Sequence, residues 1–242
     1  MGDDVVHGWT AALMPVLSPD DLQTYSFFAD LQPEQLSQLL DRHHCSDHEV
    51  DQVLVMEQDW GESVFLLLSG IAKVRRFTSD GDEVVMSVLG AGDVFGEMAA
   101  LDGAARSADV VALSAVRLLK LRGATFATLL HNSSAFALAL ARLEAERLRD
   151  LNQRFSIQAS DATTRLLDAL AYLARKSSSA NDPQALIPQL AQRDLALLAG
   201  MARETASRTL SKLRSKGTVV EENGCLKLAD LKPLIKRGLI AA

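Results

Sequence analysis

The stretch GDVFGEMAALDGAARSADV, residues 92–110, carries the residue types of an anion-binding turn between two strands. Gly96 lets the backbone approach a ligand closely, because glycine has no side chain. The small and aliphatic residues after it predict a short helical turn, whose first peptide N–H groups can point at an anion. Arg106 offers a planar guanidinium that matches phosphate oxygens, Ser107 adds a hydroxyl donor, and Glu97 can accept a hydrogen bond from a sugar hydroxyl. Spacing alone leaves open that Glu97 and Arg106 form an ordinary surface pair.

Short apolar runs separated by turn residues surround this stretch. Gly and Asp occur in the breaks at residues 59–63, 78–83 and 90–93, and no proline occurs between residues 50 and 122. Such runs are typical of antiparallel strands, and the lack of proline suits pairing on both strand edges. We therefore predict a β-barrel or sandwich whose strands are residues 53–56, 64–70, 71–77, 84–89 and 108–121.

Helices are predicted on both sides of the strands. Residues 1–24 contain two prolines and no sustained periodicity, and we expect a loosely attached extension there. Residues 27–43 place leucines near helical spacing, with Pro33 where a first-turn proline is tolerated. Residues 124–158 contain no proline or glycine and are rich in Ala, Leu, Arg and Glu, which favours a long helix.

One stripe of the long helix is apolar. Its members recur at alternating three- and four-residue steps, which is the spacing of a seam against a second helix. Packing against the chain's own barrel is the alternative. We favour a dimer seam because the stripe is narrow and Arg and Glu crowd it. The seam consists of Ala141, Ala145, Leu148, Leu151 and Phe155.

A helix–turn–helix is predicted near the end of the chain. A helix over residues 161–175 and a polar connector over 176–184 precede it. In QRDLALLAGMARETASRTLSKLRSKG, residues 192–217, Gly200 lies where the first helix should end in a left-handed residue, and apolar spacing resumes in a helix from about Ala202. The last sixty residues look helical to about residue 215 and end in VVEENGCLKL, whose Asn-Gly predicts a hairpin.

The polar face of the second helix suits a DNA groove. Arginine can bond guanine O6 and N7 together, and a carboxylate can accept a hydrogen bond from cytosine N4. Basic residues near the helix end suit phosphates. A solvated helix with mixed charges is the alternative, because a turn with glycine at this position is a weak signal alone. The face carries Arg203, Glu204, Ser207, Arg208, Lys212 and Arg214, with Lys216 just beyond.

The composition is that of a globular protein with a basic C-terminal part. The 242 residues are 48% hydrophobic and 23% charged, which argues against a disordered or low-complexity chain. The net charge of −6 hides an asymmetry, since residues 1–182 hold 15 Lys/Arg and 26 Asp/Glu, whereas residues 183–242 hold 10 and 5. This asymmetry fits a local contact with a polyanion.

Several kinds of site are not expected. No apolar run approaches the ~20 residues that cross a bilayer, and the N-terminus is acidic where a signal peptide is basic, so we expect a cytoplasmic protein with no membrane partner. Cys45 and Cys225 are too few for a cysteine-ligated iron–sulfur cluster and are expected to be unpaired. We expect no metal or haem site in HHCSDHE, residues 43–49, because neighbouring residues on a loop rarely all point inward. No nucleophile elbow or catalytic triad can be placed, so we expect no catalytic residues and no enzyme.

FGEMAALDGAARSA resembles the phosphate-binding cassette of cyclic-nucleotide-binding domains, and GESVFLLLSGIAKV, residues 61–74, resembles the strand pair ahead of it. The resemblance covers roughly residues 27–125. It implies contacts to two parts of a cyclic nucleotide. The ribose 2′-hydroxyl would bind Glu97, and the cyclic phosphate would bind Arg106 and Ser107 with help from the backbone N–H groups of Gly96 to Met98.

The long helix departs from cyclic-AMP-responsive relatives at the base. Those relatives present a Thr-Ser pair to the adenine, and the matching positions here are Leu151 and Asn152. Asn152 can bond a purine edge, whereas Leu151 can only pack. The resemblance therefore implies cyclic AMP first and leaves cyclic GMP open. Arg147 matches a position that pairs with the cassette glutamate, which would tie the ligand site to the helix.

RETASRTL resembles the recognition helix of the CRP/FNR family of transcription regulators, and VVEENGCLKL resembles the family's wing. Arg203, Glu204 and Arg208 stand at the base-reading positions, which implies a pseudo-palindromic site with TGTGA-like halves. The fold implied is α+β. It consists of an N-terminal extension (1–24), a jelly-roll-like cyclic-nucleotide-binding β-roll (25–130), a dimerisation helix (131–158) and a winged helix-turn-helix DNA-binding domain (159–242).

The function implied is that of a homodimeric transcription regulator under allosteric control by a cyclic nucleotide. Its partners would be double-stranded DNA, a second copy of the chain and RNA polymerase. The nucleotide would shift an equilibrium between two arrangements of the DNA-binding domains, one of which faces successive major grooves ~34 Å apart. Two alternatives stay open: a regulator of this family that binds DNA without a nucleotide and keeps a vestigial pocket, and a nucleotide-binding adaptor with no DNA role. No metal, haem or iron–sulfur cluster is expected.

Overall fold

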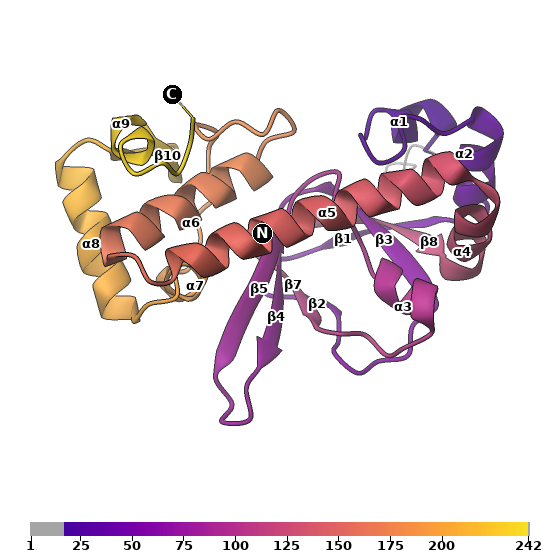
Figure 1. The fold of residues 1–242 in the computed structure, drawn as a ribbon, viewed down its shortest axis with the longest axis horizontal. Helices are drawn as coiled ribbons and strands as arrows, with labels where there is room; N and C mark the ends of the chain where they lie inside the picture. Colours follow the sequence, from indigo (N-terminus) through magenta and orange to yellow (C-terminus); the bar gives the residue numbers. More distant parts are fainter. Residues whose placement is uncertain (1–16, 242) are drawn as a thin grey trace, which may run out of the picture.

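The computed structural model describes residues 17–241 as a β-roll, a long helix and a C-terminal helical part (Figure 1). The α+β fold class with a jelly-roll-like β-roll is confirmed, because the roll is built from two four-stranded antiparallel sheets. The first sheet has the order β1 (His44–His48), β8 (Val116–Arg122), β3 (Ser63–Ser69), β6 (Val94–Phe95). The second has the order β2 (Val53–Val55), β7 (Asp109–Ala112), β4 (Ala72–Phe77), β5 (Glu83–Leu89).

Three sequence interpretations of the roll need correction. Residues 108–121 do not form one strand, because the chain leaves the second sheet after β7 and enters the first with β8. Residues 61–74 are not a hydrogen-bonded strand pair: β3 and β4 lie in different sheets, joined at Gly70, whose φ of +84° favours glycine. Residues 44–48 form strand β1, paired with β8, and not a loop.

The prediction of a loose N-terminal extension is wrong for residues 17–24. Helix α1 (Pro19–Gln23) starts at a capping box formed by Ser18 and Asp21. Its Leu22 is fully buried in the core that α2 (Pro33–Leu40) also covers. Pro33 is the first residue of α2, as the sequence predicted. Residues 1–16, the rest of the predicted extension, lie outside the described residues.

The helical stretch over residues 124–158 is two helices, α4 (Gly123–Asn132) and α5 (Ser134–Ile157). The break is local, because Ser133 accepts a hydrogen bond from the Phe136 N–H and caps α5. The two axes differ by 109°. Among residues 17–241 no single helix is long and apolar enough to cross a membrane, and this bent pair passes that test only when its two helices are taken together.

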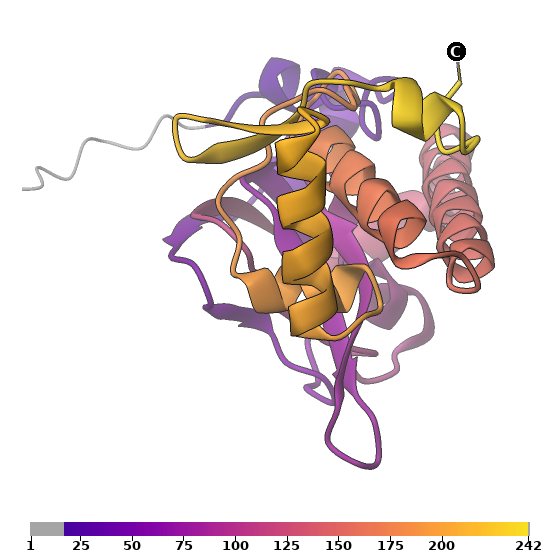
Figure 2. The ribbon, with the colours of Figure 1, turned by 90° about the vertical axis from the view of Figure 1, so that its left-hand side faces the viewer.

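The C-terminal part contains the predicted helix–turn–helix and hairpin (Figure 2). The residues between its first two helices are not helical: Ile187 forms a β-bridge with Leu226 of the hairpin. Gly200, with φ of +60°, ends the first helix of the motif as predicted. The elements are α6 (Ala162–Lys176), α7 (Gln192–Leu198), α8 (Arg203–Ser215), β9 (Val219–Glu222), β10 (Cys225–Leu228) and α9 (Lys232–Ile235).

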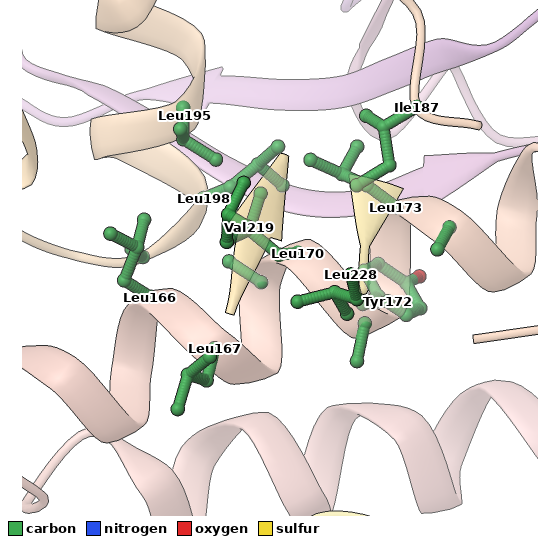
Figure 3. Packing of buried hydrophobic residues seen from close by; sticks show 14 of the residues in the cluster. Leu166, Leu167, Leu170, Tyr172, Leu173, Ile187, Leu195, Leu198, Val219 and Leu228 are labelled. Atoms are coloured by element: carbon green, nitrogen blue, oxygen red, sulfur yellow. The ribbon is translucent and has the colours of Figure 1, made fainter. Parts of the chain in front are cut away.

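The C-terminal core continues onto the β-roll. Leu170 and Leu173 of α6 pack with Leu195 of α7 and Leu228 of the hairpin (Figure 3). The same buried cluster contains four residues of the second sheet and its connections, Ile71, Val85, Val88 and Leu113. The two parts of the chain therefore share one hydrophobic core.

Candidate functional site

The predicted cassette forms one wall of a pocket of about 180 Å³. Strand β6 leads into α3 (Glu97–Asp102), and the chain then passes Arg106 to β7. The opposite walls come from the second sheet and from two residues of α5. The pocket contains the following sequence-predicted residues: Gly96, Glu97, Met98, Arg106, Ser107 and Arg147.

Arg106 is a buried cation that neighbouring backbone holds in place. Its Nη1 donates to the Gly96 carbonyl at 2.7 Å and its Nη2 donates to the Ser63 carbonyl at 2.6 Å. These two bonds leave three of the five guanidinium N–H donors for other partners. Burial lowers the pKa of Arg106, and Glu97 and Asp59 offset this effect only in part. An anion in the pocket would neutralise the buried charge.

Two glycines make room for the guanidinium. A Cβ on Gly61 would lie 2.7 Å from Nη2 of Arg106, and a Cβ on Gly96 would lie 2.6 Å from Nη1. Gly96 also has φ of +80° and begins α3, so its conformation favours glycine as well. The first turn of α3 lines the same pocket as Arg106. The first N–H groups of a helix have no carbonyl acceptor within the helix.

Glu97 has one oxygen that is satisfied and one that is not. Its Oε1 accepts from Nη1 of Arg147 at 2.8 Å, whereas the buried Oε2 has no hydrogen-bond partner in the described residues. Desolvation raises the pKa of Glu97, although the Arg147 guanidinium acts in the opposite direction. A buried acceptor without a donor is costly, so a ligand hydroxyl at Oε2 would be stabilising.

Arg147 connects the pocket to α5. Its guanidinium contacts Glu97 and the Val94 carbonyl of β6, and Glu144 one turn earlier on the same helix lies 2.9 Å from Nη1. The side chain therefore joins the strand that enters the cassette, the ribose-binding candidate and the long helix. Any shift of the cassette relative to α5 must change these contacts.

The two predicted base-contacting residues are not in this pocket. Leu151 lines a neighbouring cavity with Arg154 and Tyr172, and Asn152 is exposed and lines none of the described pockets. These two positions of α5 do not line the pocket of their own chain. Their contact with a base stays a prediction, and it requires a second subunit.

The predicted seam of α5 is exposed in the single chain. Phe155 is 81% exposed and Leu148 60%, and Leu151 and Ala141 are also exposed. Ala145 is half-buried. The alternative that this stripe packs on the chain's own barrel therefore fails for most of its members.

The predicted groove-reading face of α8 is open. Arg203, Glu204 and Arg208 are exposed, and Ala206, Leu210 and Leu213 hold the opposite face in the core. Nε of Arg208 donates to the Glu204 carbonyl at 3.3 Å, which orients the guanidinium along the helix surface. Ser207 is half-buried and Lys212 is exposed, whereas Arg214 pairs with Glu221 of the hairpin at 3.0 Å.

Sequence reasoning missed the remaining walls of the pocket. They come from alternate positions along the strands of the second sheet. Once the sheet is known, the alternation of side chains along each strand identifies them. They include Val55, Val74, Ser87, Leu89 and Val110. Elsewhere, Cys45 and Cys225 are both unpaired, and residues 17–241 contain no group of three His, Cys, Asp or Glu side chains placed to hold a metal ion.

Comparison with known proteins identifies the family. The description "Cyclic nucleotide-binding domain" matches residues 48–133, and "Crp-like helix-turn-helix domain" matches residues 164–237. The chain is 32% identical over 195 residues to the "Cyclic AMP receptor protein" of Thermus thermophilus, which covers 79% of this chain and 87% of that protein. The chain belongs to the CRP family of transcription regulators. It is thus a DNA-binding regulator with a cyclic-nucleotide-binding domain.

Other proteins are similar to this chain in sequence or in fold. The "CRP-like cAMP-activated global transcriptional regulator" of Mycobacterium tuberculosis is 23% identical over 87% of this chain and 95% of its own length. The solved structure of FixK2 from Bradyrhizobium japonicum has the same fold, with a TM-score of 0.68, 20% identity, and coverage of 83% of this chain and 98% of its own. The structure of CLP from Xanthomonas campestris, described as c-di-GMP responsive, gives 0.64 at 21% identity, covering 82% and 100%.

The raised pKa of Glu97 predicts a pH-dependent stability. The folded state holds the Glu97 proton to a higher pH than the unfolded chain, whose ordinary value is 4.5. Over the interval above pH 4.5 the folded state therefore binds more protons, and its stability falls as pH rises.

Glu97→Gln removes this titration. We expect denaturant unfolding without nucleotide to show wild type losing stability relative to Glu97→Gln as pH rises from 4.5 to 7. A difference that is constant, or that grows in favour of wild type, contradicts the prediction.

Proposed function

We propose that this protein is a homodimeric transcription regulator whose DNA affinity is set by a cyclic nucleotide bound between the cassette and α5. Cyclic AMP is the first candidate and cyclic GMP the second. The observation that carries the proposal is the pairing of a buried, unneutralised guanidinium at Arg106 with a buried, unpartnered carboxylate oxygen at Glu97. A cyclic phosphate and a ribose 2′-hydroxyl satisfy these two groups in one ligand.

The phosphate half would use the free donors of Arg106, the hydroxyl of Ser107 and the N–H groups from Gly96 to Met98. Ser107 is exposed at the pocket, and its hydroxyl has only a long contact of 3.8 Å with the Met98 sulfur. It is therefore free to turn toward an anion.

The base half would lie toward α5, where the chain offers Leu151 and Asn152. Neither side chain reaches the pocket of its own chain, so we propose that Asn152 of a second subunit meets the purine edge. The names of the similar proteins from Thermus thermophilus and Mycobacterium tuberculosis mention cyclic AMP, which favours adenine. Titration calorimetry with cyclic AMP, cyclic GMP and cyclic di-GMP compares the three effectors directly.

Regulation would act through Arg147 and α5. A nucleotide hydroxyl that binds Glu97 would either replace the Arg147 contact or add to it. Two arrangements of α5 that differ in this contact would therefore bind the ligand with different affinities. Only such a difference can shift the population of DNA-binding states.

The dimer would form along the α5 seam, of which Ala141, Leu148, Leu151 and Phe155 are exposed in the single chain and Ala145 is half-buried. Two copies would place their α8 helices ~34 Å apart on successive major grooves. Arg203, Glu204 and Arg208 would read a TGTGA-like half-site, Ser207 would lie beside them, and Lys212 and Arg214 would contact phosphates. We further propose RNA polymerase as a partner and a cytoplasmic location.

A second candidate is a regulator that binds DNA without a nucleotide. One observation favours it: Arg106 and Glu97 already have protein partners in Gly96, Ser63 and Arg147. DNA affinity measured with and without cyclic AMP and cyclic GMP distinguishes the two candidates, since the second predicts no change.

Arg106→Ala should abolish tight nucleotide binding. It removes charge-assisted hydrogen bonds to a buried phosphate, so we expect calorimetry to show a dissociation constant raised on the order of 100-fold or more. Arg117→Ala is the matched control, because Arg117 belongs to the same β-roll but pairs with Asp47 away from the pocket. Its affinity should equal that of wild type. Unchanged affinity in Arg106→Ala refutes the phosphate assignment.

Arg208→Ala should cost about 1–3 kcal/mol at one base pair and relax selectivity there. A binding-site selection with the variant measures both. Lys212→Ala is the comparison, since loss of a phosphate contact weakens binding to all sequences and lowers the salt slope by about 1. If selection with Arg208→Ala returns the wild-type preference, Arg208 contacts phosphate and not a base.

Leu148→Glu should shift the protein toward monomer in analytical ultracentrifugation, because it places a charge in the middle of the proposed seam. Leu186→Glu, at another exposed leucine outside α5, should leave the association unchanged. A tight Leu148→Glu dimer would move the interface away from α5.

A further inference from the structure

The second sheet of the β-roll has one face toward the nucleotide pocket and one toward the DNA-binding domain. Val74, Ser87 and Leu89 line the pocket. Their strand neighbours point the other way: Val88 belongs to the core shared with α6 and α7, and Lys73 reaches α7 itself. Because side chains alternate along a strand, the hairpin β4–β5 lies between the proposed nucleotide pocket and the helix–turn–helix.

A buried cluster of charges lies on the face toward α7. Lys73 is 5% exposed, and its Nζ lies 2.5 Å from Oδ1 of Asp194 and 2.6 Å from Oε1 of Glu83. Oε2 of Glu83 lies 2.7 Å from Nη2 of Arg193. Lys73 and Glu83 belong to the hairpin β4–β5, whereas Arg193 and Asp194 belong to α7, the first helix of the helix–turn–helix.

This cluster restricts the docking geometry more than the apolar contacts around it. Hydrophobic burial is non-directional, so Val85 and Val88 could slide along α6 and α7 at modest cost. A buried lysine that serves two carboxylates has few acceptable positions, because removing either partner leaves an uncompensated charge. Glu83 also lies 3.7 Å from Arg75, which a second carboxylate, Asp109, holds at 3.2 Å. Arg75 of β4 is therefore held by carboxylates of the two neighbouring strands, β5 and β7.

Other contacts bring α6 to the same hairpin. The hydroxyl of Tyr172 donates to the Val88 carbonyl at 3.2 Å and accepts from its N–H at 3.3 Å. Nζ of Lys176 lies 2.8 Å from Asp93, which immediately precedes β6. These contacts hold α6, whereas Lys73 provides the buried ionic contact to α7.

We propose that Lys73 is a positioning residue for DNA reading: it fixes α7, and through α7 the recognition helix α8, to the sheet whose opposite face is the nucleotide pocket. A change of β4–β5 on one face then moves the helix–turn–helix on the other. The ionic docking stands on the contacts above, and its regulatory consequence rests on the proposed nucleotide binding.

Hydrogen–deuterium exchange of the full chain without nucleotide tests the docking. Lys73→Met keeps most of the side-chain volume and removes the charge. We expect amides of residues 83–89 and 192–198 to exchange at least about threefold faster, because a short helix that loses its tertiary contacts opens locally. Residues 116–122, in the other sheet, should keep the wild-type rate. Unchanged exchange over 192–198 overturns the proposal.

Two further variants separate the charge from its surroundings. Lys73→Arg keeps a cation and should restore wild-type exchange over residues 192–198. Arg76→Met is the matched control: Arg76 lies on the same strand and pairs with Glu57 at 2.7 Å, but this pair is confined to the β-roll. It should leave α7 unchanged. If Lys73→Met also accelerates residues 116–122, Asp194→Asn, which leaves β4 intact, replaces it with the same expectation.

The regulatory half is measured as the ratio of DNA dissociation constants without and with cyclic AMP. We expect Lys73→Met to bring this ratio at least about fivefold closer to 1, within the usual range of allosteric coupling, while Lys73→Arg and Arg76→Met keep the wild-type ratio. A wild-type ratio in Lys73→Met overturns the regulatory role. If wild type itself shows no effect of nucleotide, the proposed function fails, and the exchange data still decide the docking.

Discussion

The buried guanidinium of Arg106 is the constraint on which the proposed nucleotide pocket depends. Its position requires two glycines beside it, two carbonyls in front of it and a strand on either side of the cassette. Because these partners are uncharged, the cation is held without being neutralised. The fold thus holds a buried guanidinium beside the first turn of α3, inside an otherwise acidic β-roll.

A small number of contacts links the pocket to the rest of the chain. Arg147 brings α5 to the cassette, and the second sheet separates the pocket from the helix–turn–helix by the thickness of one strand layer. Three features described separately, the pocket wall, the shared core and the Lys73 cluster, are therefore parts of one continuous packing arrangement. An effect of a ligand in the proposed nucleotide pocket on the proposed DNA-reading helix would therefore need no long chain of intermediates.

Much of this arrangement was readable from the sequence because it rests on local rules. Gly96 and Gly200 mark turns that require left-handed backbone, Asn-Gly marks the hairpin, and Pro33 marks a helix start. The errors concern contacts between distant residues. Leu22 looked peripheral until the core that buries it was known, β1 carries polar residues that disguise a strand, and the separation of β3 from β4 depends on sheet closure. Lys73 stands in a strand like any solvated lysine, and its burial is explained by Glu83 of the next strand and by Asp194, 121 residues away.

The hydrophobic core shared by the two halves has a practical meaning for how this protein can be divided. Cutting between α5 and α6 would bare Ile71, Val85, Val88 and Leu113 on one fragment and the leucine face of α6 on the other. Each fragment would then expose an apolar surface that favours association, and charged side chains that have lost an ionic partner. The β-roll and the C-terminal part therefore cannot be separated cleanly, and a stable fragment would have to keep the β4–β5 hairpin together with the helices that pack on it.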